Sequence, residues 1–273
     1  MAYALSQWHY LEQHPADAPE VPDISKVANE VWNEINSLCS LNHVEINANY
    51  NYERFSTPEY KYVLATASRT MFLINNEWQS GALNKYNITG EIRIDVNPYV
   101  PNGWNVDTGS CNVGNHYDLR TVLRHEILHG IGISSSITPE KVGHSVGSYC
   151  FPYAFDNVIV DGSGDRVVSG CHLLTELRSE MYVGGIQLYH PDRFRIGSSL
   201  SHLDQRGLMF FGIPSRECLK FDDASLTMLN SIGAKCAISP PVGVTSGASD
   251  TSLWGIYISL FLCIKCLMAL LRN

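Results

Sequence analysis

The segment Asp118-Leu-Arg-Thr-Val-Leu-Arg-His-Glu-Ile-Leu-His-Gly-Ile-Gly132 determines how we interpret the rest of the chain. Asp118 is a favourable helix N-cap, and Gly130 and Gly132 follow where the helix should stop. The pattern therefore predicts a helix over about 118–131. Its apolar residues cover nearly all of its faces, so we expect a buried helix; they are Val122, Leu123, Ile127, Leu128 and Ile131.

Three polar residues of this helix form the pattern His-Glu-x-x-His. His125 and His129 are four residues apart and project from the same face, at a distance that suits two ligands of one zinc ion. Glu126 would lie beside the metal as a general base that takes a proton from water and returns it to a leaving amine. A solvated helix face is the structural alternative, but a buried helix would leave these side chains without partners. We therefore predict Zn²⁺ as the cofactor.

A catalytic zinc site needs a third protein ligand and an open position. The extended pattern His-Glu-x-x-His-x-x-Gly-x-x-His matches at Gly132 but has Ser135 at its final position. The remaining candidates are downstream: His144, His172, His190, His202, and Glu176 or Glu180 for a carboxylate site. The surroundings of His202, from Ser198 to Pro214, favour it as the third ligand.

At these residues the chain resembles the metzincin zinc metallopeptidases, in particular the leishmanolysin-like branch. In that branch an insertion separates the active helix from the third His, which precedes a Met-turn and a closing helix. The similar features here are His202, Leu208-Met209 and the segment Phe221–Gly233, and the likeness covers roughly residues 43–236.

This resemblance implies an α/β fold of the metzincin-like zincin type, with a twisted mixed sheet, an active-site helix and an irregular C-terminal subdomain. It implies His125, His129 and His202 as metal ligands, Glu126 as the base, and Met209 as the Met-turn residue below the site. The implied activity is zinc-dependent hydrolysis of peptide bonds within extended polypeptides. The family also suggests that the predicted strand 91–96 is an edge that aligns the substrate.

The pattern of the remaining chain indicates alternating helices and strands. We expect a helix capped by Asp23, a strand over 43–50, a helix over about 58–78, a strand over 91–96, irregular short strands over about 134–200, a third-ligand and Met-turn segment over 202–214, and a closing helix over about 221–232.

Cysteine usage and charge limit the class of protein. The net charge is −8 and no basic run occurs, which argues against nucleic-acid partners. Six cysteines precede the C-terminal tail without a Cys-x-x-Cys pair, which favours disulfides in an oxidising compartment; they are Cys39, Cys111, Cys150, Cys171, Cys218 and Cys236. For Cys39 a disulfide is favoured over an inhibitory thiolate. The sequon Asn87-Ile88-Thr89 agrees with a secreted domain.

The C-terminal residues predict a membrane anchor. We expect a catalytic domain over 1–238, a linker over 239–252 and a hydrophobic tail over 253–271, either a transmembrane helix or a removable glycolipid signal. The first twenty residues do not have the composition of a secretory signal. The extracellular face is favoured, with a cytosolic body on a tail anchor as the alternative, and nothing indicates the oligomeric state.

Two other functions fit the same residues. One is a gluzincin-type peptidase with Glu176 as the third ligand. The other is a catalytically inactive, membrane-tethered binding or adhesion domain that keeps zinc for structure. The intact Glu126 argues against the second, because a structural zinc site needs no base.

Overall fold

The structure is a computed structural model that describes residues 21–83, 89–106, 114–138, 141–146, 151–177, 180–195 and 197–238. All of them belong to the first of two units of the chain, Met1–Ile238. The predicted linker and tail and residues Asn87 and Ile88 of the sequon lie outside the described residues. Within these ranges no helix is long and apolar enough to cross a membrane, and the anchor at 253–271 stays a prediction.

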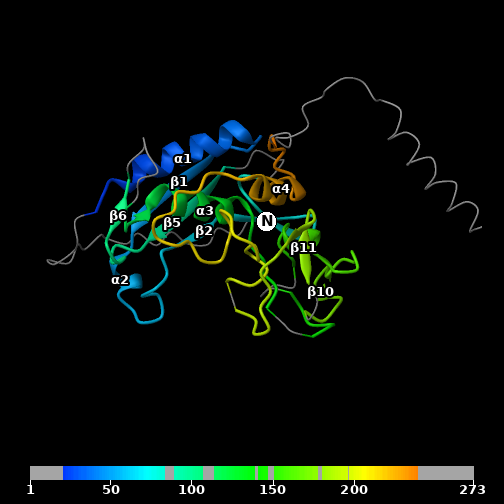
Figure 1. Cartoon of the computed structure of the whole chain (residues 1–273). Coiled ribbons are helices and arrows are strands. Elements are labelled where there is room, and N and C mark those ends of the chain that lie inside the picture. The colour runs from blue at the N-terminus through cyan, green and yellow to red at the C-terminus, as the bar shows by residue number, and fades with distance from the viewer. Residues whose placement is uncertain are drawn as a thin grey trace, which may run out of the picture. The chain divides into compact units, whose positions relative to one another are not determined.

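The fold is α/β, as predicted, and is built around a small mixed sheet (Figure 1). Strand β5 (Gly90–Val96) lies in the middle, parallel to β1 (Val44–Tyr50) and antiparallel to β2 (Ala65–Arg69). The prediction that strand 91–96 is the sheet edge is therefore wrong, because β5 is paired on both sides. Strands β1 and β2 form the two edges of this sheet.

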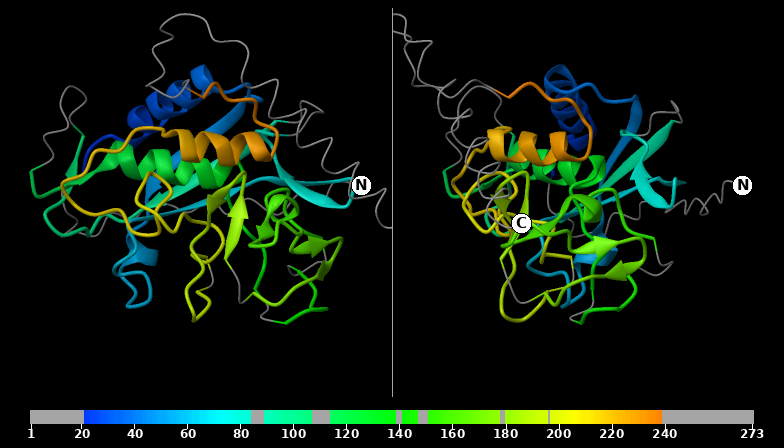
Figure 2. Two further views of the ribbon diagram at one scale, coloured as in Figure 1. Left: turned by 45° about the vertical axis from the view of Figure 1, so that its right-hand side comes forward. Right: turned by 90° about the vertical axis from the view of Figure 1, so that its right-hand side faces the viewer.

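Helices α1 (Ile24–Leu38) and α3 (Leu119–Ile131) pack on this sheet and on each other (Figure 2). Helix α1 begins at the predicted cap, since Asp23 accepts a hydrogen bond from Ser25 N at 3.1 Å. Two ion pairs join the helices: Glu30 with Arg120, and Glu34 with Arg124 at 3.0 Å.

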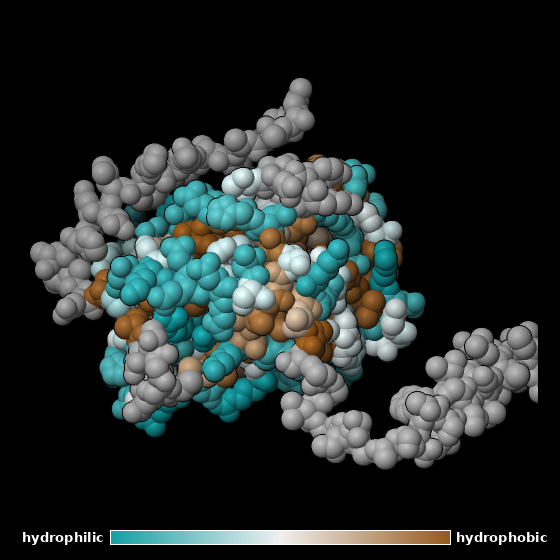
Figure 3. Space-filling model, turned by 90° about the horizontal axis from the view of Figure 1, so that it is seen from above, coloured by the Kyte–Doolittle hydropathy of each residue, from teal (hydrophilic) through white to brown (hydrophobic). Residues whose placement is uncertain are grey.

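The two faces of α1 differ in polarity. Its buried positions are apolar, whereas its exposed ones are polar, namely Ser25, Lys26, Asn29, Asn33, Asn36 and Ser37. The molecule seen from above is accordingly hydrophilic over much of its surface, with hydrophobic areas in between (Figure 3). An amphipathic helix of this kind covers the core with one face and meets solvent with the other.

The helix predicted over 58–78 is absent from the structure. The chain forms the short helix α2 (Tyr52–Phe55) and then β2, β3 (Met71–Ile74) and β4 (Glu77–Ser80). Strands β3 and β4 are joined by Asn75-Asn76, both of which have positive φ, at 51° and 64°. Two such residues form the tight turn that matches the twist of a hairpin, and asparagine tolerates this conformation better than most residues. The turn chemistry therefore outweighs the helical pattern.

The remaining elements are short. They are β6 (Trp104–Asn105), β7 (Tyr117–Asp118), the 3-10 turn η1 (Asp156–Val158), β8 (Val160–Asp161), β9 (Val168–Ser169), β10 (His172–Leu173), β11 (Met181–Val183), β12 (Ile186–Gln187) and α4 (Asp223–Ser231). The described residues between 134 and 200 form only short strands and turns, and α4 lies within the segment predicted as the closing helix, with Asp222 as its cap.

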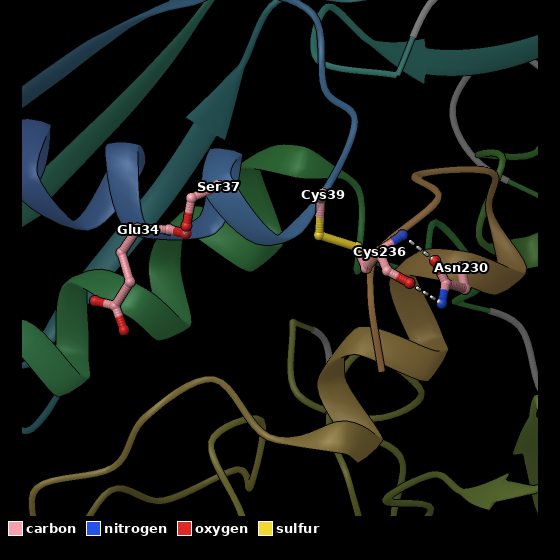
Figure 4. Close-up of a disulfide and its surroundings, with 5 residues drawn as sticks. All are labelled: Glu34, Ser37, Cys39, Asn230 and Cys236. Atoms are coloured by element: carbon pink, nitrogen blue, oxygen red, sulfur yellow. Dashed lines mark hydrogen bonds between the residues drawn. A yellow bond between two sulfur atoms is a disulfide. The ribbon is translucent and has the colours of Figure 1, made fainter. Parts of the chain in front are cut away.

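A disulfide joins Cys39, at the end of α1, to Cys236, which follows α4 (Figure 4). The side-chain amide of Asn230 accepts a hydrogen bond from the N–H of Cys236 and donates one to its carbonyl. The preference for a disulfide at Cys39 is confirmed, and Cys171 and Cys218 are disulfide-bonded as well. The Cys39–Cys236 bond ties two segments that are 197 residues apart in the chain.

We expect the Cys39→Ala/Cys236→Ala double variant to lose about 2–5 kcal/mol of unfolding free energy, because the unfolded chain regains the freedom that this long closed loop removes. Equilibrium denaturant unfolding of wild type and variant measures the difference. Equal midpoints for the two proteins would show that the hydrogen bonds around Cys236 hold the two ends together without the disulfide.

Candidate metal centre

Helix α3 is buried and supplies His125, Glu126 and His129 to the candidate site. It begins after Asp118, whose carboxylate accepts hydrogen bonds from the N–H of Thr121 at 2.9 Å and from its hydroxyl at 2.6 Å. It ends at Gly132, which has φ 154°. The predicted cap, bounds and burial of this helix are confirmed.

The structure brings together the three histidines that the sequence singles out. The Nε2 atoms of His125 and His129 are 3.1 Å apart, and His202 Nε2 lies 3.1 Å from the first and 3.2 Å from the second. His125 and His129 are one helical turn apart, whereas His202 comes from a loop 73 residues after His129. Among the described residues, these three form the group that could hold a metal ion, and the other candidates lie outside it, namely His144, His172, His190, Glu176 and Glu180.

Backbone carbonyls fix the proton on each ring. The Nδ1 atom of His125 lies 2.7 Å from the carbonyl oxygen of Leu208. The Nδ1 atom of His129 lies 2.5 Å from the carbonyl oxygen of Ile133, and the Nδ1 atom of His202 lies 2.9 Å from that of Ser198. A carbonyl only accepts, so each neutral ring carries its proton on Nδ1. The three Nε2 atoms then face one another with lone pairs and no hydrogen between them.

This arrangement fits a bound cation. Two ligand nitrogens of a tetrahedral zinc ion, at about 2.0–2.1 Å from the metal, are separated by about 3.3 Å. The observed separations of 3.1–3.2 Å are close to that value. Without a cation, three buried lone pairs would face each other without a donor, which is unfavourable.

The histidines are held in the neutral form that metal binding requires. Burial, together with the neighbouring His202, lowers the pKa of His125 to about 3, although the hydrogen bond to Leu208 opposes this shift. Burial lowers the pKa of His129 well below its usual value, with further lowering by His125 and His202. Burial also lowers the pKa of His202.

Glu126 lies beside these ligands and is also buried, with 7% of its surface exposed. Burial raises the pKa of Glu126 to about 8, although the N–H of Ala67 in β2 donates to the carboxylate and the charge of Arg54 opposes the shift. This pKa would fall beside a bound dication, because a nearby opposite charge favours the ionised form. Glu126 can therefore exchange protons near neutral pH.

Met209 is fully buried in the segment predicted as the Met-turn. Its carbonyl accepts a hydrogen bond from Leu203 N at 2.8 Å, and the preceding Leu208 provides the carbonyl for His125. The segment from His202 to Met209 is thus folded back on itself next to the histidine cluster.

Several residues that support the site could not be found from the sequence. The partners of the three rings are backbone carbonyls, which no residue type signals. Arg69 of β2 donates to the carbonyl of His129 at 2.6 Å. Asp222, the N-cap of α4, also accepts a hydrogen bond from Leu208 N at 2.8 Å. It thereby holds the residue whose carbonyl binds His125.

We expect His202→Ala to reduce the zinc content of the purified protein well below one ion per chain, because two ligands remain. His172→Ala is the matched control, since His172 is exposed and outside the cluster. Glu176→Ala tests the carboxylate alternative in the same assay. Elemental analysis after dialysis measures the content, and a loss in Glu176→Ala with full content in His202→Ala would reverse the ligand assignment.

The stability of the metal-free protein should fall as the pH is lowered from 7 to 5. Below about 6.5 the unfolded chain binds protons at the three histidines, whereas the folded chain, with lowered pKa values, does not. Each histidine contributes up to about 1.4 kcal/mol per pH unit. Glu126, with its raised pKa, acts in the opposite sense between about 4.5 and 8 and offsets roughly one histidine.

Denaturant unfolding in the presence of chelator measures this pH dependence. We expect the slope to be shallower in His202→Asn, which lacks one of the three groups. An identical slope in wild type and variant would mean that His202 does not titrate below its unfolded value.

Comparison of the chain with models of known protein families, with curated proteins and with solved structures finds no match. The interpretation of the site therefore depends on the residues themselves: three buried histidines with converging Nε2 atoms and a buried glutamate beside them.

Proposed function

We propose that this protein is a zinc-dependent endopeptidase of the metzincin type, similar to the leishmanolysin-like branch. The observation that carries the proposal is the convergence of three Nε2 lone pairs next to the buried carboxyl of Glu126. His125, His129 and His202 would hold the ion. When bound there, zinc would supply a Lewis acid that polarises the scissile carbonyl and makes water more acidic.

Glu126 would act as general base and then as general acid. Its carboxylate removes a proton from the attacking water while the water oxygen bonds to the carbonyl carbon of the substrate. The carboxylic acid then donates this proton to the departing nitrogen as the carbon–nitrogen bond breaks. The backbone N–H of Ala67 in β2 lowers the pKa of Glu126 and so favours the ionised form that accepts the proton.

Strand β2 supports an extended polypeptide as substrate. It lies at the edge of the mixed sheet and is paired in that sheet with β5 on one side. An extended peptide can add to such an edge through main-chain hydrogen bonds. Because Ala67 lies within β2 and contacts Glu126, a peptide along this edge would pass next to the base.

The same features favour the metzincin type over the gluzincin type. The third histidine follows a long irregular insertion, and the fully buried Met209 follows it closely. Glu176, the ligand that a gluzincin-type site would need, is not a member of the histidine group.

We expect Glu126→Ala to lower kcat/KM for peptide hydrolysis by about 10²–10⁴-fold, because it removes the base. Its zinc content should stay at the wild-type level, because no ligand is lost. Glu53→Ala, at an exposed position of α2, is the matched control and should cleave like wild type. Cleavage of a peptide library by the full chain, with and without chelator, measures both.

Two results would contradict this proposal. Loss of zinc together with activity in Glu126→Ala would make Glu126 a ligand or a support of the site. Absence of chelator-sensitive cleavage in a wild-type protein that holds one zinc per chain would favour a binding domain with a zinc ion instead.

A further inference from the structure

Asp156 is a fully buried carboxylate outside the group of metal ligands. It lies at the start of η1 and accepts hydrogen bonds from two segments. The hydroxyls of Ser135 and Ser136 each donate to it at 2.6 Å, and the N–H of Ser136 lies 3.2 Å from both of its oxygens. The N–H of Tyr153 also donates, at 2.9 Å. One carboxylate therefore joins the turn after α3 to the insertion.

The turn that Asp156 holds contacts both parts of the metal centre. Ser135 N donates to the hydroxyl oxygen of Ser201 at 3.0 Å, and Ser201 directly precedes His202. On the other side, Ile133 is two residues before Ser135, and its carbonyl accepts the Nδ1 proton of His129. Asp156 is thus connected, through the turn that it holds, to His129 and to His202, which come from distant parts of the chain.

Ser135 is the residue at the position where the extended zinc-binding pattern has its third histidine. Here its side chain binds Asp156 and its N–H binds Ser201. Ser135 therefore contacts the loop of the third ligand and is not itself a member of the histidine group. This contact holds the loop of the distant His202 next to the end of α3.

We propose that Asp156 is a positioning residue of the metal centre, which sets the place of His202 relative to His129 through Ser135 and Ser201. The inference rests on the proposed metal site. A carboxylate suits this role because it only accepts, and each group that faces it can donate. Asparagine would place an amide donor against these donors. Changes to residues that orient metal ligands typically weaken metal binding by about 10–100-fold.

The test is the zinc dissociation constant of the full chain, measured by competition with a chromogenic chelator. We expect Asp156→Asn to bind zinc about 10–100-fold more weakly than wild type. Asp161→Asn is the matched control from the same insertion. Its carboxylate also accepts backbone hydrogen bonds, from Ser163 at 2.9 Å and Asp165 at 3.1 Å, and these are local to its own turn. Its affinity should equal that of wild type.

A second variant tests the link without disturbing the buried carboxylate. Ser201→Ala removes the acceptor for Ser135 N, and we expect its zinc affinity to fall by about tenfold. Asp156→Asn and Ser201→Ala combined should lose less than the product of the two single effects, because both act through Ser135. Denaturant unfolding of the metal-free proteins reports separately whether each variant is folded.

The outcomes separate this inference from the proposed function. Wild-type zinc affinity in folded Asp156→Asn would overturn the inference, and if that variant does not fold, wild-type affinity in Ser201→Ala would do so. A lower stability of the metal-free protein with an unchanged dissociation constant would also overturn it, since Asp156 would then only stabilise the fold. Zinc binding that depends on Asp156, without peptide cleavage by wild type, would refute the peptidase and leave the positioning role in place.

Discussion

The structure depends on keeping three imidazole lone pairs aimed at one point inside the protein. Nitrogen atoms 3.1–3.2 Å apart without a shared proton do not adopt this arrangement unaided. Each ring is held from behind by a carbonyl of a different segment, at Ile133, Ser198 and Leu208. The turn after α3, the loop before His202 and the turn after it must therefore all be fixed in place. Loops normally have the greatest freedom, so this requires many specific contacts.

The helix that carries two of the histidines is fixed by very close packing against the sheet. A Cβ atom on Gly130 would lie 2.4 Å from Cγ2 of Ile92 in β5, so glycine allows an approach that no other residue would. This approach places Glu126 against β2, where the N–H of Ala67 meets its carboxylate. The ion pair of Arg124 with Glu34 joins α3 to α1. The same packing contacts of α3 therefore form the core and position the candidate site.

Local chemistry made part of this predictable from the sequence. Asp118, Gly132 and the apolar residues between them indicate a buried helix, and His125 and His129 follow from its period. The residues around His202 indicate it as the third ligand, and the structure brings it to the other two histidines. The sequence around Asn75-Asn76 predicts a helix, whereas the chain forms a hairpin there, because two asparagines with positive φ make its tight turn. Asp156 could not be foreseen, since a buried carboxylate that binds hydroxyls and main-chain groups has no pattern in the sequence.

The residues of the site favour the proposed catalytic role of the metal over a purely structural role. Structural zinc sites are almost always closed by four protein ligands, whereas catalytic sites use three and leave a position open. The described residues offer three histidine ligands, and Glu126, which is adjacent in sequence to His125, is a buried acid outside this group. Burial of a carboxyl group is costly unless it is hydrogen-bonded or paired with an opposite charge. A purely structural ion would need no buried acid beside it, whereas the proposed hydrolysis needs one.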